Sequence, residues 1–251
     1  MNVVVNADDF GWSKSCTDAI LQSFEKGYIT TTTMCTNGEA FQYAVEQVKQ
    51  TKYKDNVGIH FTLTEGHPLT KAISTNPRFC DENGLFHGQI ARYKPLDKES
   101  CKAVLAELNA QAQRFVDSGL VFHHADSHHH IHTAPCIAPL VFKVMKQFGI
   151  QKLRIHRNIG TMSSLKRTLK QAYNLTLGKR KYTELFGSFE DVKSFCFLPS
   201  KATLEVMCHP DLDENGVLVD RANSAPYYAP YGIPMEKQAG LLHERNERYE
   251  Q

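Results

Sequence analysis

The chain has 251 residues, of which 41% are hydrophobic and 22% charged, and its 29 basic and 27 acidic residues give a net charge of +2. These values are ordinary for a globular chain and exclude a disordered, collagen-like or coiled-coil protein. The basic residues are scattered along the sequence, so we expect no nucleic-acid partner. No stretch approaches the ~20 apolar residues of a membrane span, so we expect no membrane association.

Short apolar runs alternate with helical patterns along the chain, and Gly, Asn or Ser marks most of the changes. The predicted strands are residues 3–6, 28–35, 57–63, 121–126, 152–156 and 203–208. The predicted helices are residues 17–26, 39–49, 98–117, 135–148 and 163–177. Between them, residues 65–95 are rich in Gly and Pro, as segments that cover a site often are.

Strands that alternate with helices predict a parallel sheet with right-handed crossovers. No G-x-G-x-x-G motif follows a strand, which argues against a dinucleotide-binding fold. We therefore expect one α/β domain over residues 1–251, a (β/α) barrel that is distorted or incomplete, with its site at the C-terminal ends of the strands.

The seven cysteines are an odd number without a C-x-x-C pair, which argues against a disulfide framework and against a zinc ribbon. The N-terminus lacks the basic and long apolar regions of a signal peptide. Both features predict a cytoplasmic protein with reduced thiols. The densest basic run, between Lys166 and Lys181, predicts a solvated helix face and loop, with contact to an anionic group of a substrate as the alternative.

Asp or His side chains stand at the ends of four predicted strands. Asp8 and Asp9 follow the first strand, His60 lies in the third, His128 follows the fourth and His209 follows the last. Because the C-terminal ends of parallel strands converge on one face, we expect these side chains to share one rim. Adjacent residues point in different directions, so Asp8 and Asp9 can have different partners.

Histidine is concentrated in one place, since six of the 12 histidines fall within residues 123–132. An Asp with two His is a familiar set of ligands for a divalent metal ion, and it leaves positions open for water and substrate. His128 is the best placed ligand of the run, because it follows the strand directly. His130 and His132 are candidates for supporting the ligands or for contacting substrate. Metal storage by the whole run is the competing interpretation, but it leaves the residues at the other strand ends unexplained.

Four motifs resemble those of the YdjC-like carbohydrate deacetylases, and most closely the chitooligosaccharide deacetylases of the ChbG type. They are N-A-D-D-F-G at residues 6–11, G-I-H-F-T-L-T at 58–64, D-S-H-H-H-I-H at 126–132 and L-E-V-M-C-H-P at 204–210. The resemblance extends over residues 2 to about 212, and we expect the tail beyond to depart from the family pattern.

The resemblance implies a distorted (β/α) barrel, commonly a homodimer, that removes the N-acetyl group from N-acetylglucosamine units of short chitooligosaccharides, phosphorylated or not, and releases acetate. It implies one divalent metal ion held by Asp9, His60 and His128, with Asp8 as base and His209 as general acid. Family members are usually described as using Mg²⁺. Two imidazoles and one carboxylate, however, suit Zn²⁺ or another transition metal better.

Two other classes of function stay open. One is a metal-dependent phosphoesterase or other hydrolase on the same barrel, although phosphoesterases more often hold two metals with bridging carboxylates. The other is a non-catalytic metal- or sugar-binding protein, which would not need Asp8 beside a ligand Asp9.

Substrate-binding residues are only weakly indicated by the sequence. Arg154 is a candidate for binding an anion or orienting a carboxylate, and a salt bridge with a neighbouring Asp or Glu is the alternative. Residues 65–95 and the tyrosines Tyr227, Tyr228 and Tyr231 are candidates for the aromatic walls of a sugar site, with packing and turn formation as the alternative.

Overall fold

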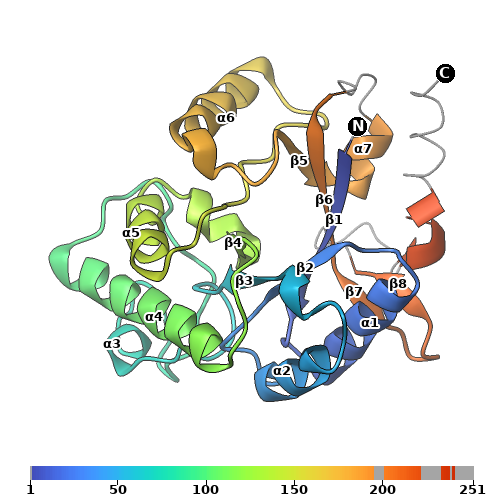
Figure 1. The fold of residues 1–251 in the computed structure, drawn as a ribbon. Coiled ribbons are helices and arrows are strands. Elements are labelled where there is room, and N and C mark those ends of the chain that lie inside the picture. The colour runs from blue at the N-terminus through green and yellow to red at the C-terminus, as the bar shows by residue number, and fades with distance from the viewer. Residues whose placement is uncertain (1, 195–200, 222–232, 238, 241–251) are drawn as a thin grey trace.

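The computed structural model describes residues 2–194, 201–221, 233–237 and 239–240. At its centre, six parallel strands form a curled sheet with the order β4-β3-β2-β1-β6-β5, and helices pack around it (Figure 1). The strands of this sheet are β1 (Asn2–Phe10), β2 (Thr31–Met34), β3 (Val57–Phe61), β4 (Ala125–Ser127), β5 (Leu185–Ser188) and β6 (Thr203–Cys208). The expected α/β fold, a distorted and incomplete (β/α) barrel, is confirmed.

Seven α-helices and three short 3-10 helices are present in the described part of the chain. They are α1 (Lys14–Glu25), α2 (Phe41–Lys49), α3 (Lys71–Ser74), α4 (Lys98–Asp117), α5 (Ala138–Phe148), α6 (Ser164–Thr176), α7 (Phe189–Ser194), η1 (Lys54–Asn56), η2 (His128–Thr133) and η3 (Gly178–Arg180). A small antiparallel sheet follows β6 and packs against α1. Its strands are β7 (Pro210–Leu212), β8 (Leu218–Asp220) and β9 (Ile233–Pro234).

All five helices predicted from the sequence are present, because local signals define their ends. Asp97 caps α4 by accepting a hydrogen bond from the Ser100 N–H, and α4 has the predicted bounds. Helix α1 begins three residues earlier than predicted, because Ser13 caps it. Helix α5 ends at Gly149, whose φ of 71° lies in the left-handed region.

The predicted strand at residues 152–156 is wrong, since only Leu153 pairs there. Leu153 forms isolated bridges with Ala125 on one side and Lys181 on the other. Beyond it, the backbone N–H and C=O of His156 bond to the Asn174 side chain instead of to a neighbouring strand. A barrel strand between β4 and β5 is thus reduced to a single residue, which is why the barrel is incomplete. Strand β5 and helix α7 are not among the predicted elements.

Strand β1 runs four residues further than predicted, through Asp8 and Asp9 to Phe10. Its pairing with β2 shifts register between Ala7 and Phe10, and Asp9 has a φ of 70°. Left-handed backbone is uncommon for a non-glycine residue and often marks a functional position. The irregularity therefore falls where the two adjacent carboxylates leave the strand.

Apolar side chains from the sheet and the helices form one contiguous core among the described residues. A single domain over residues 1–251 stays a prediction. The described cysteines, Cys16, Cys35, Cys80, Cys101, Cys136 and Cys208, are all free, and Cys196 lies outside the described residues. In the described ranges, no helix combines the length and the hydropathy that crossing a membrane requires.

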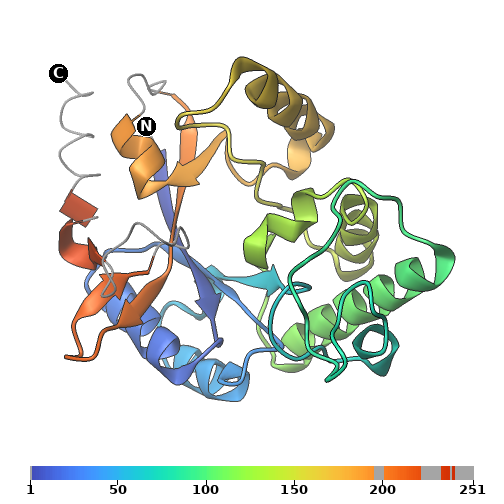
Figure 2. The ribbon, with the colours of Figure 1, turned by 180° about the vertical axis from the view of Figure 1, so that it is seen from behind.

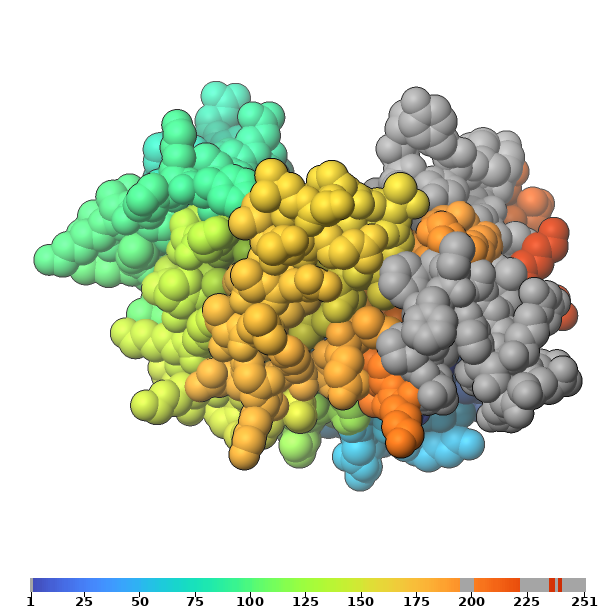
Figure 3. Space-filling model, turned by 90° about the horizontal axis from the view of Figure 1, so that it is seen from above, coloured from blue at the N-terminus to red at the C-terminus, as the bar shows by residue number. Residues whose placement is uncertain are grey.

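Helix α6 stands apart from the other helices when the fold is viewed from the front and from behind (Figures 1 and 2). Its residues also lie open on the face seen from above (Figure 3). It carries the start of the basic run, with Lys166 exposed and Lys170 partly buried. The apolar side chains of Leu165, Leu169 and Leu175 are exposed along it.

Candidate active site

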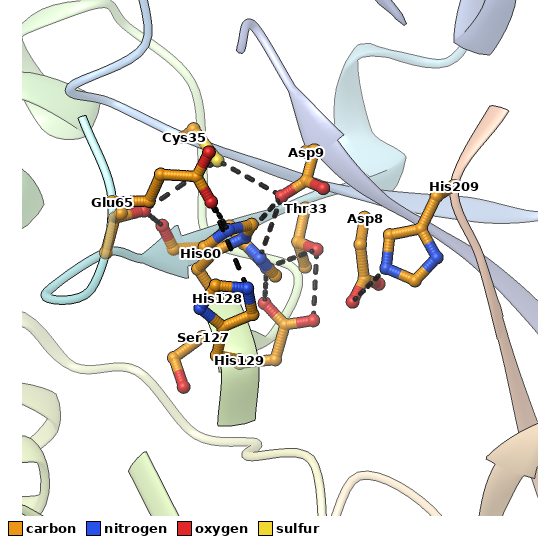
Figure 4. Close-up of polar contacts among 12 residues, drawn as sticks. Asp8, Asp9, Thr33, Cys35, His60, Glu65, Ser127, His128, His129 and His209 are labelled. Carbon is orange, nitrogen blue, oxygen red and sulfur yellow. Dashed lines mark hydrogen bonds and ion pairs between the residues drawn. The ribbon is translucent and has the colours of Figure 1, made fainter. Parts of the chain in front are cut away.

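The residues expected at four strand ends lie together at one rim of the sheet (Figure 4). Asp8 and Asp9 leave β1, His60 lies on β3, His128 opens η2 directly after β4, and His209 follows β6. Strands β1 and β6 are neighbours in the sheet, and β2 separates β1 from β3. The side chains of Asp9, His60 and His128 meet at this rim.

Asp9, His60 and His128 form a compact group of possible metal ligands. The Oδ1 atom of Asp9 lies 3.2 Å from Nε2 of His60 and 2.8 Å from Nδ1 of His128. One ligand atom from each of the three residues falls within 4.8 Å of the others. Both imidazoles are buried. Three such atoms around one point suit a single divalent ion with open positions.

His60 is oriented by a second carboxylate behind it. Its Nδ1 atom lies 2.6 Å from Oδ1 of Asp126, and the Thr33 hydroxyl donates to the other oxygen of Asp126 at 3.0 Å. Burial disfavours a charged imidazole, but the Asp126 and Asp9 carboxylates outweigh it and raise the pKa of His60 to about 10. The surrounding carboxylates therefore favour a positive charge at this position. Because Nδ1 of His60 contacts Asp126, its Nε2 atom is directed at Asp9.

His128 is held in the same way by two carboxylates. Its Nδ1 atom faces Asp9, and its Nε2 atom lies 3.0 Å from Oε2 of Glu65. Burial again opposes protonation, and Asp9 together with Glu65 raises the pKa of His128 to about 9. The indole of Trp12 stacks on the imidazole of His128, with ring centroids 5.4 Å apart and planes 12° from parallel.

Asp8 is buried beside this group and directed at Arg154, with one ligand atom within 4.8 Å of those of His60 and Asp126. Nη1 and Nη2 of Arg154 each donate to one oxygen of Asp8 at 2.7 Å, and Nδ2 of Asn6 donates to Oδ1 of Asp8 at 2.9 Å. Burial raises the pKa of the Asp8 carboxyl, but the adjacent Arg154 guanidinium outweighs burial and holds that pKa well below its usual range. Asp8 is therefore ionised at neutral pH.

Arg154 lies at the centre of three buried carboxylates. Its guanidinium is fully buried and also contacts Asp126 and Glu205 at 2.7 Å. Salt bridges with neighbouring acidic residues were one of the two alternatives for Arg154, and the structure has them. All of its described contacts are internal, so the arginine connects Asp8 to the carboxylate that orients His60.

His209 approaches Asp8 from the far side of the site. Its Nε2 atom lies 3.9 Å from Oδ2 of Asp8, and its backbone N–H donates to the Asp220 side chain at 2.7 Å. The hydrogen bond from β8 fixes the backbone at the turn between β6 and β7. The imidazole of His209 stays partly exposed, which gives it access to a bound molecule.

His130 and His132 lie in η2, away from the group around Asp9. Both nitrogens of His132 bond internally, Nδ1 to the Ser127 hydroxyl at 2.5 Å and Nε2 to the Arg154 carbonyl at 3.2 Å. Burial lowers the pKa of His132 to about 3, so it is neutral. The ring of His130 packs edge-on against Phe186, and its buried Nδ1 has no hydrogen-bond partner among the described residues. His132 thus has a supporting position.

Three contributors to the site received no role from the sequence: Asp126, Glu65 and Glu205. Asp126 and Glu205 stand inside the motifs, where a charged residue in a buried strand is a signal that could have identified them. Glu65 opens the segment 65–95, which was expected to cover a site. The buried carboxylate of Glu107 accepts the backbone N–H groups of Leu69 and Thr70 and anchors this segment. Tyr227, Tyr228 and Tyr231 lie outside the described residues.

The chemistry of the donors fits a divalent cation. The carboxylates of Asp126 and Glu65 contact the two imidazoles of the group, and the carboxylate of Asp9 is itself a possible metal ligand. The raised pKa values of His60 and His128 have the same origin, an excess of negative charge that a metal ion would neutralise in place of two protons. Nε2 of His60 and Nδ1 of His128 are the nitrogens directed at Asp9.

The family model described as YdjC-like protein matches residues 2–244. The family pattern therefore continues past residue 212, where we had expected it to end. A chitooligosaccharide deacetylase of Salmonella paratyphi B is 34% identical over 223 residues, covering 85% of this chain and 82% of the relative. A carbohydrate deacetylase of Clostridium beijerinckii is 29% identical over 234 residues, covering 90% and 88%.

A carbohydrate deacetylase of Oceanobacillus iheyensis is 37% identical over 150 residues, covering 60% of this chain and 63% of the relative. That alignment spans less than two thirds of either protein. The crystal structure of a protein from Enterococcus faecalis V583, named as a cellobiose-phosphate cleavage protein, superposes with a TM-score of 0.69 at 21% identity and covers 99% of this chain and 94% of that one. It supports the fold alone.

The expectation of a hydrolase of the carbohydrate deacetylase class is confirmed by these relatives at the level of the family. The family match over nearly the whole chain and the shared identity lead to one conclusion: the chain belongs to the YdjC-like family.

Proposed function

We propose that the protein is a metal-dependent deacetylase that hydrolyses the N-acetyl group of N-acetylglucosamine units in short chitooligosaccharides and releases acetate. The observation that carries the proposal is the meeting of Asp9, His60 and His128 around one point, with the ionised Asp8 on the same rim. A metal-storage or sugar-binding protein has no use for a second carboxylate held beside the ligands.

Asp9, His60 and His128 would hold the metal ion. When bound, a divalent cation there supplies Lewis-acid chemistry, since it polarises a carbonyl oxygen and lowers the pKa of water. Mg²⁺ follows from the family resemblance. Zn²⁺ or another transition metal follows from the donor set, because two imidazole nitrogens favour these ions over Mg²⁺.

Asp8 would act as the base that accepts the proton of the attacking water. It is ionised because Arg154 binds both of its oxygens, and the same two hydrogen bonds fix the plane of the carboxylate. Asp9 points to the imidazoles while Asp8 points to Arg154, so the two adjacent carboxylates have separate tasks. Arg154 keeps the buried Asp8 carboxylate charged, and for the same reason it makes that carboxylate a weaker base.

His209 would act as the general acid for the departing amine. It lies on the side of Asp8 opposite to the metal ligands, and its partial exposure leaves room for a sugar. Deacetylation needs a proton delivered to the amine nitrogen, because an amine anion is a very poor leaving group. An imidazole can deliver that proton near neutral pH.

We include phosphorylated chitooligosaccharides, such as diacetylchitobiose 6-phosphate, in the proposed substrate class. Three cations support it: Lys170, Arg92 and Lys166 lie close enough to His156 to lower its pKa, after burial, to about 4. Arg92 also donates to the backbone carbonyl of His129, next to the ligand His128, at 2.7 Å. An anionic group on the sugar would neutralise this cluster beside the site.

The decisive experiment measures acetate release from N-acetylglucosamine oligomers and from their 6-phosphates, with and without a chelator. We expect release that the chelator abolishes and that added divalent metal restores. Phosphate release from a sugar phosphate without acetate release would favour the phosphoesterase alternative. Stoichiometric binding of sugar or metal without release of either product would favour the binding-protein alternative.

A cytoplasmic location and a homodimer complete the proposal. The free thiols of the described cysteines support the first, since disulfides are rare in reducing compartments. The exposed leucines of α6, each at least 63% exposed, support the second because they offer an apolar surface for a partner copy. Light scattering on the purified protein measures the oligomeric state directly.

A further inference from the structure

We propose that Glu65 is a positioning residue that fixes the ring of His128, so that His128 offers Nδ1 to the metal while His60 offers Nε2. This inference rests on the proposed metal site and goes beyond it, because it assigns a role to Glu65 and a coordinating nitrogen to each histidine. The key juxtaposition is one imidazole between two carboxylates, Asp9 at 2.8 Å and Glu65 at 3.0 Å.

The two histidines of the group are supported in matching ways. His60 turns Nδ1 to Asp126 and Nε2 to Asp9, whereas His128 turns Nε2 to Glu65 and Nδ1 to Asp9. A carboxylate that accepts the N–H of a ligand histidine fixes its tautomer and raises its basicity as a donor. Glu65 has for His128 the geometry that Asp126 has for His60.

The ring of His128 is also restrained on its face. Trp12 stacks on it at 5.4 Å between centroids, and Gly66, the residue after Glu65, lies against the indole. A Cβ atom at Gly66 would lie 2.9 Å from Cη2 of Trp12, and Gly66 has a φ of 77°. Only glycine allows the chain to pass Trp12 so closely and still bring Glu65 to His128.

The segment that carries Glu65 is tied to η2 by further contacts. The Thr64 hydroxyl lies 3.0 Å from Nδ1 of His129, and Arg92 donates to the His129 carbonyl at 2.7 Å. His129 and His130 both have positive φ values, so the backbone of η2 turns sharply just after His128. These contacts hold the start of η2 in a conformation that local sequence does not favour.

Glu65 could instead be a direct ligand of a second ion. One ligand atom from each of Glu65, His128 and His129 lies within 4.8 Å of the others. The side chain of Glu65 is 51% exposed and that of His129 is 42% exposed, whereas the carboxylate behind His60 is fully buried. Oε2 of Glu65 lies 3.9 Å from Nε2 of His129, which is beyond hydrogen-bond distance. We therefore assign Glu65 to positioning, and stoichiometry separates the two roles.

The test compares Zn²⁺ binding by isothermal titration calorimetry in the wild type, E65Q and E65A. Glutamine keeps an oxygen that can accept the His128 N–H but loses the charge, and alanine removes the acceptor. We expect one ion per chain throughout, with affinity falling from wild type to E65Q to E65A and a total loss of about 10- to 100-fold. E82A, which removes an exposed carboxylate of the same segment, is the matched control and should bind as the wild type does.

A second measurement reads the geometry without using activity. Nitrogen-15 spectra of the Zn²⁺-loaded protein should assign metal-bound Nδ1 to His128 and metal-bound Nε2 to His60, and the His128 signal should broaden or shift in E65A. Wild-type affinity in both Glu65 variants, or two ions in the wild type and one in E65A, would overturn this inference and leave the proposed metal site standing. A wild type that binds no divalent ion would overturn both.

Discussion

The guanidinium of Arg154 binds both carboxylate oxygens of Asp8 at 2.7 Å, although the two residues are 146 positions apart in the sequence. The same side chain contacts Asp126 and Glu205, and it is fully buried. Arg154 therefore links Asp8, the proposed base, to Asp126, which orients the proposed metal ligand His60. Its removal should affect stability and catalysis together.

Arg154→Met should lower the free energy of unfolding by about 3–5 kcal/mol, because it leaves three buried carboxylates without their cation. Arg154→Lys should recover only part of this, since an ammonium cannot form the paired contact with Asp8 and reach Glu205 as well. Urea unfolding followed by circular dichroism measures both values. Arg180→Met, which removes an exposed arginine, is the control, and equal stability of Arg154→Met and this control would contradict the prediction.

Asp8→Asn should reduce the rate of acetate release by ~10²–10⁴ while leaving metal affinity close to that of the wild type. The amide keeps the size of the side chain but cannot accept the proton of water. Turnover on an N-acetylglucosamine oligomer and metal titration of the same preparation check the two parts. Asp117→Asn, at the exposed end of α4, should be silent in both, and full turnover by Asp8→Asn would refute its role as base.

His60→Ala and His128→Ala should each weaken metal binding severely, and the double variant should retain no stoichiometric metal after dialysis. Each substitution removes one of the three proposed protein ligands. Elemental analysis after equilibration with Zn²⁺ gives the metal content per chain. His87→Ala, in the segment 65–95, serves as the control, and a double variant that still holds one ion per chain would exclude these ligands.

His209→Ala should slow acetate release by ~10²–10⁴ without changing metal content, because the imidazole lies 3.9 Å from Asp8 on the side away from the ligands. The loss should be smaller for an ester of the same acyl group, since an alkoxide leaves more readily than an amine anion. Parallel assays on an amide and an ester substrate measure this contrast. Equal losses on both substrates would assign His209 to binding rather than to proton donation.

The free energy of unfolding should fall as pH decreases from about 6.5 to about 4. Burial lowers the pKa of His132 to about 3 and, with Lys170, Arg92 and Lys166, that of His156 to about 4. In this window the unfolded chain binds protons at these positions and the folded chain does not, so acid favours unfolding. His60 and His128, with raised pKa values, are protonated in both states of the metal-free protein below pH 6.5 and add little to the slope.

For His132 alone the loss between pH 6.5 and pH 4 should be about 3 kcal/mol. Urea unfolding of the metal-free protein at pH 7, 6, 5 and 4 measures the slope. His156→Gln should flatten it, because glutamine does not titrate, whereas His87→Gln should leave it unchanged. A stability that stays constant over this range would show that these histidines accept protons in the folded protein.

The sequence alone determined the helices, the parallel fold and the candidates for the rim. Helix α4 matched its predicted bounds because its cap Asp97 and the glycine after its end are local signals. Asp8, Asp9, His60, His128 and His209 could be named because strand ends converge in parallel α/β folds, whatever the detailed packing. The strand predicted at 152–156 is absent because the backbone of His156 bonds to the Asn174 side chain. That pairing depends on the position of α6, which carries Asn174.

Only the tertiary structure decided which partner each of these side chains has. Arg154 pairs with Asp8 across 146 positions, and Asp126 pairs with His60 across 66. Glu65 reaches His128 across 63 positions, from a segment that was expected to cover a site but not to contact His128. Hydrogen bonds and ion pairs act over about 3 Å, so they depend on the exact path of the chain in space. Residue types and strand order identify the rim, whereas the distances between side chains assign Asp8 to Arg154 and Asp9 to the two imidazoles.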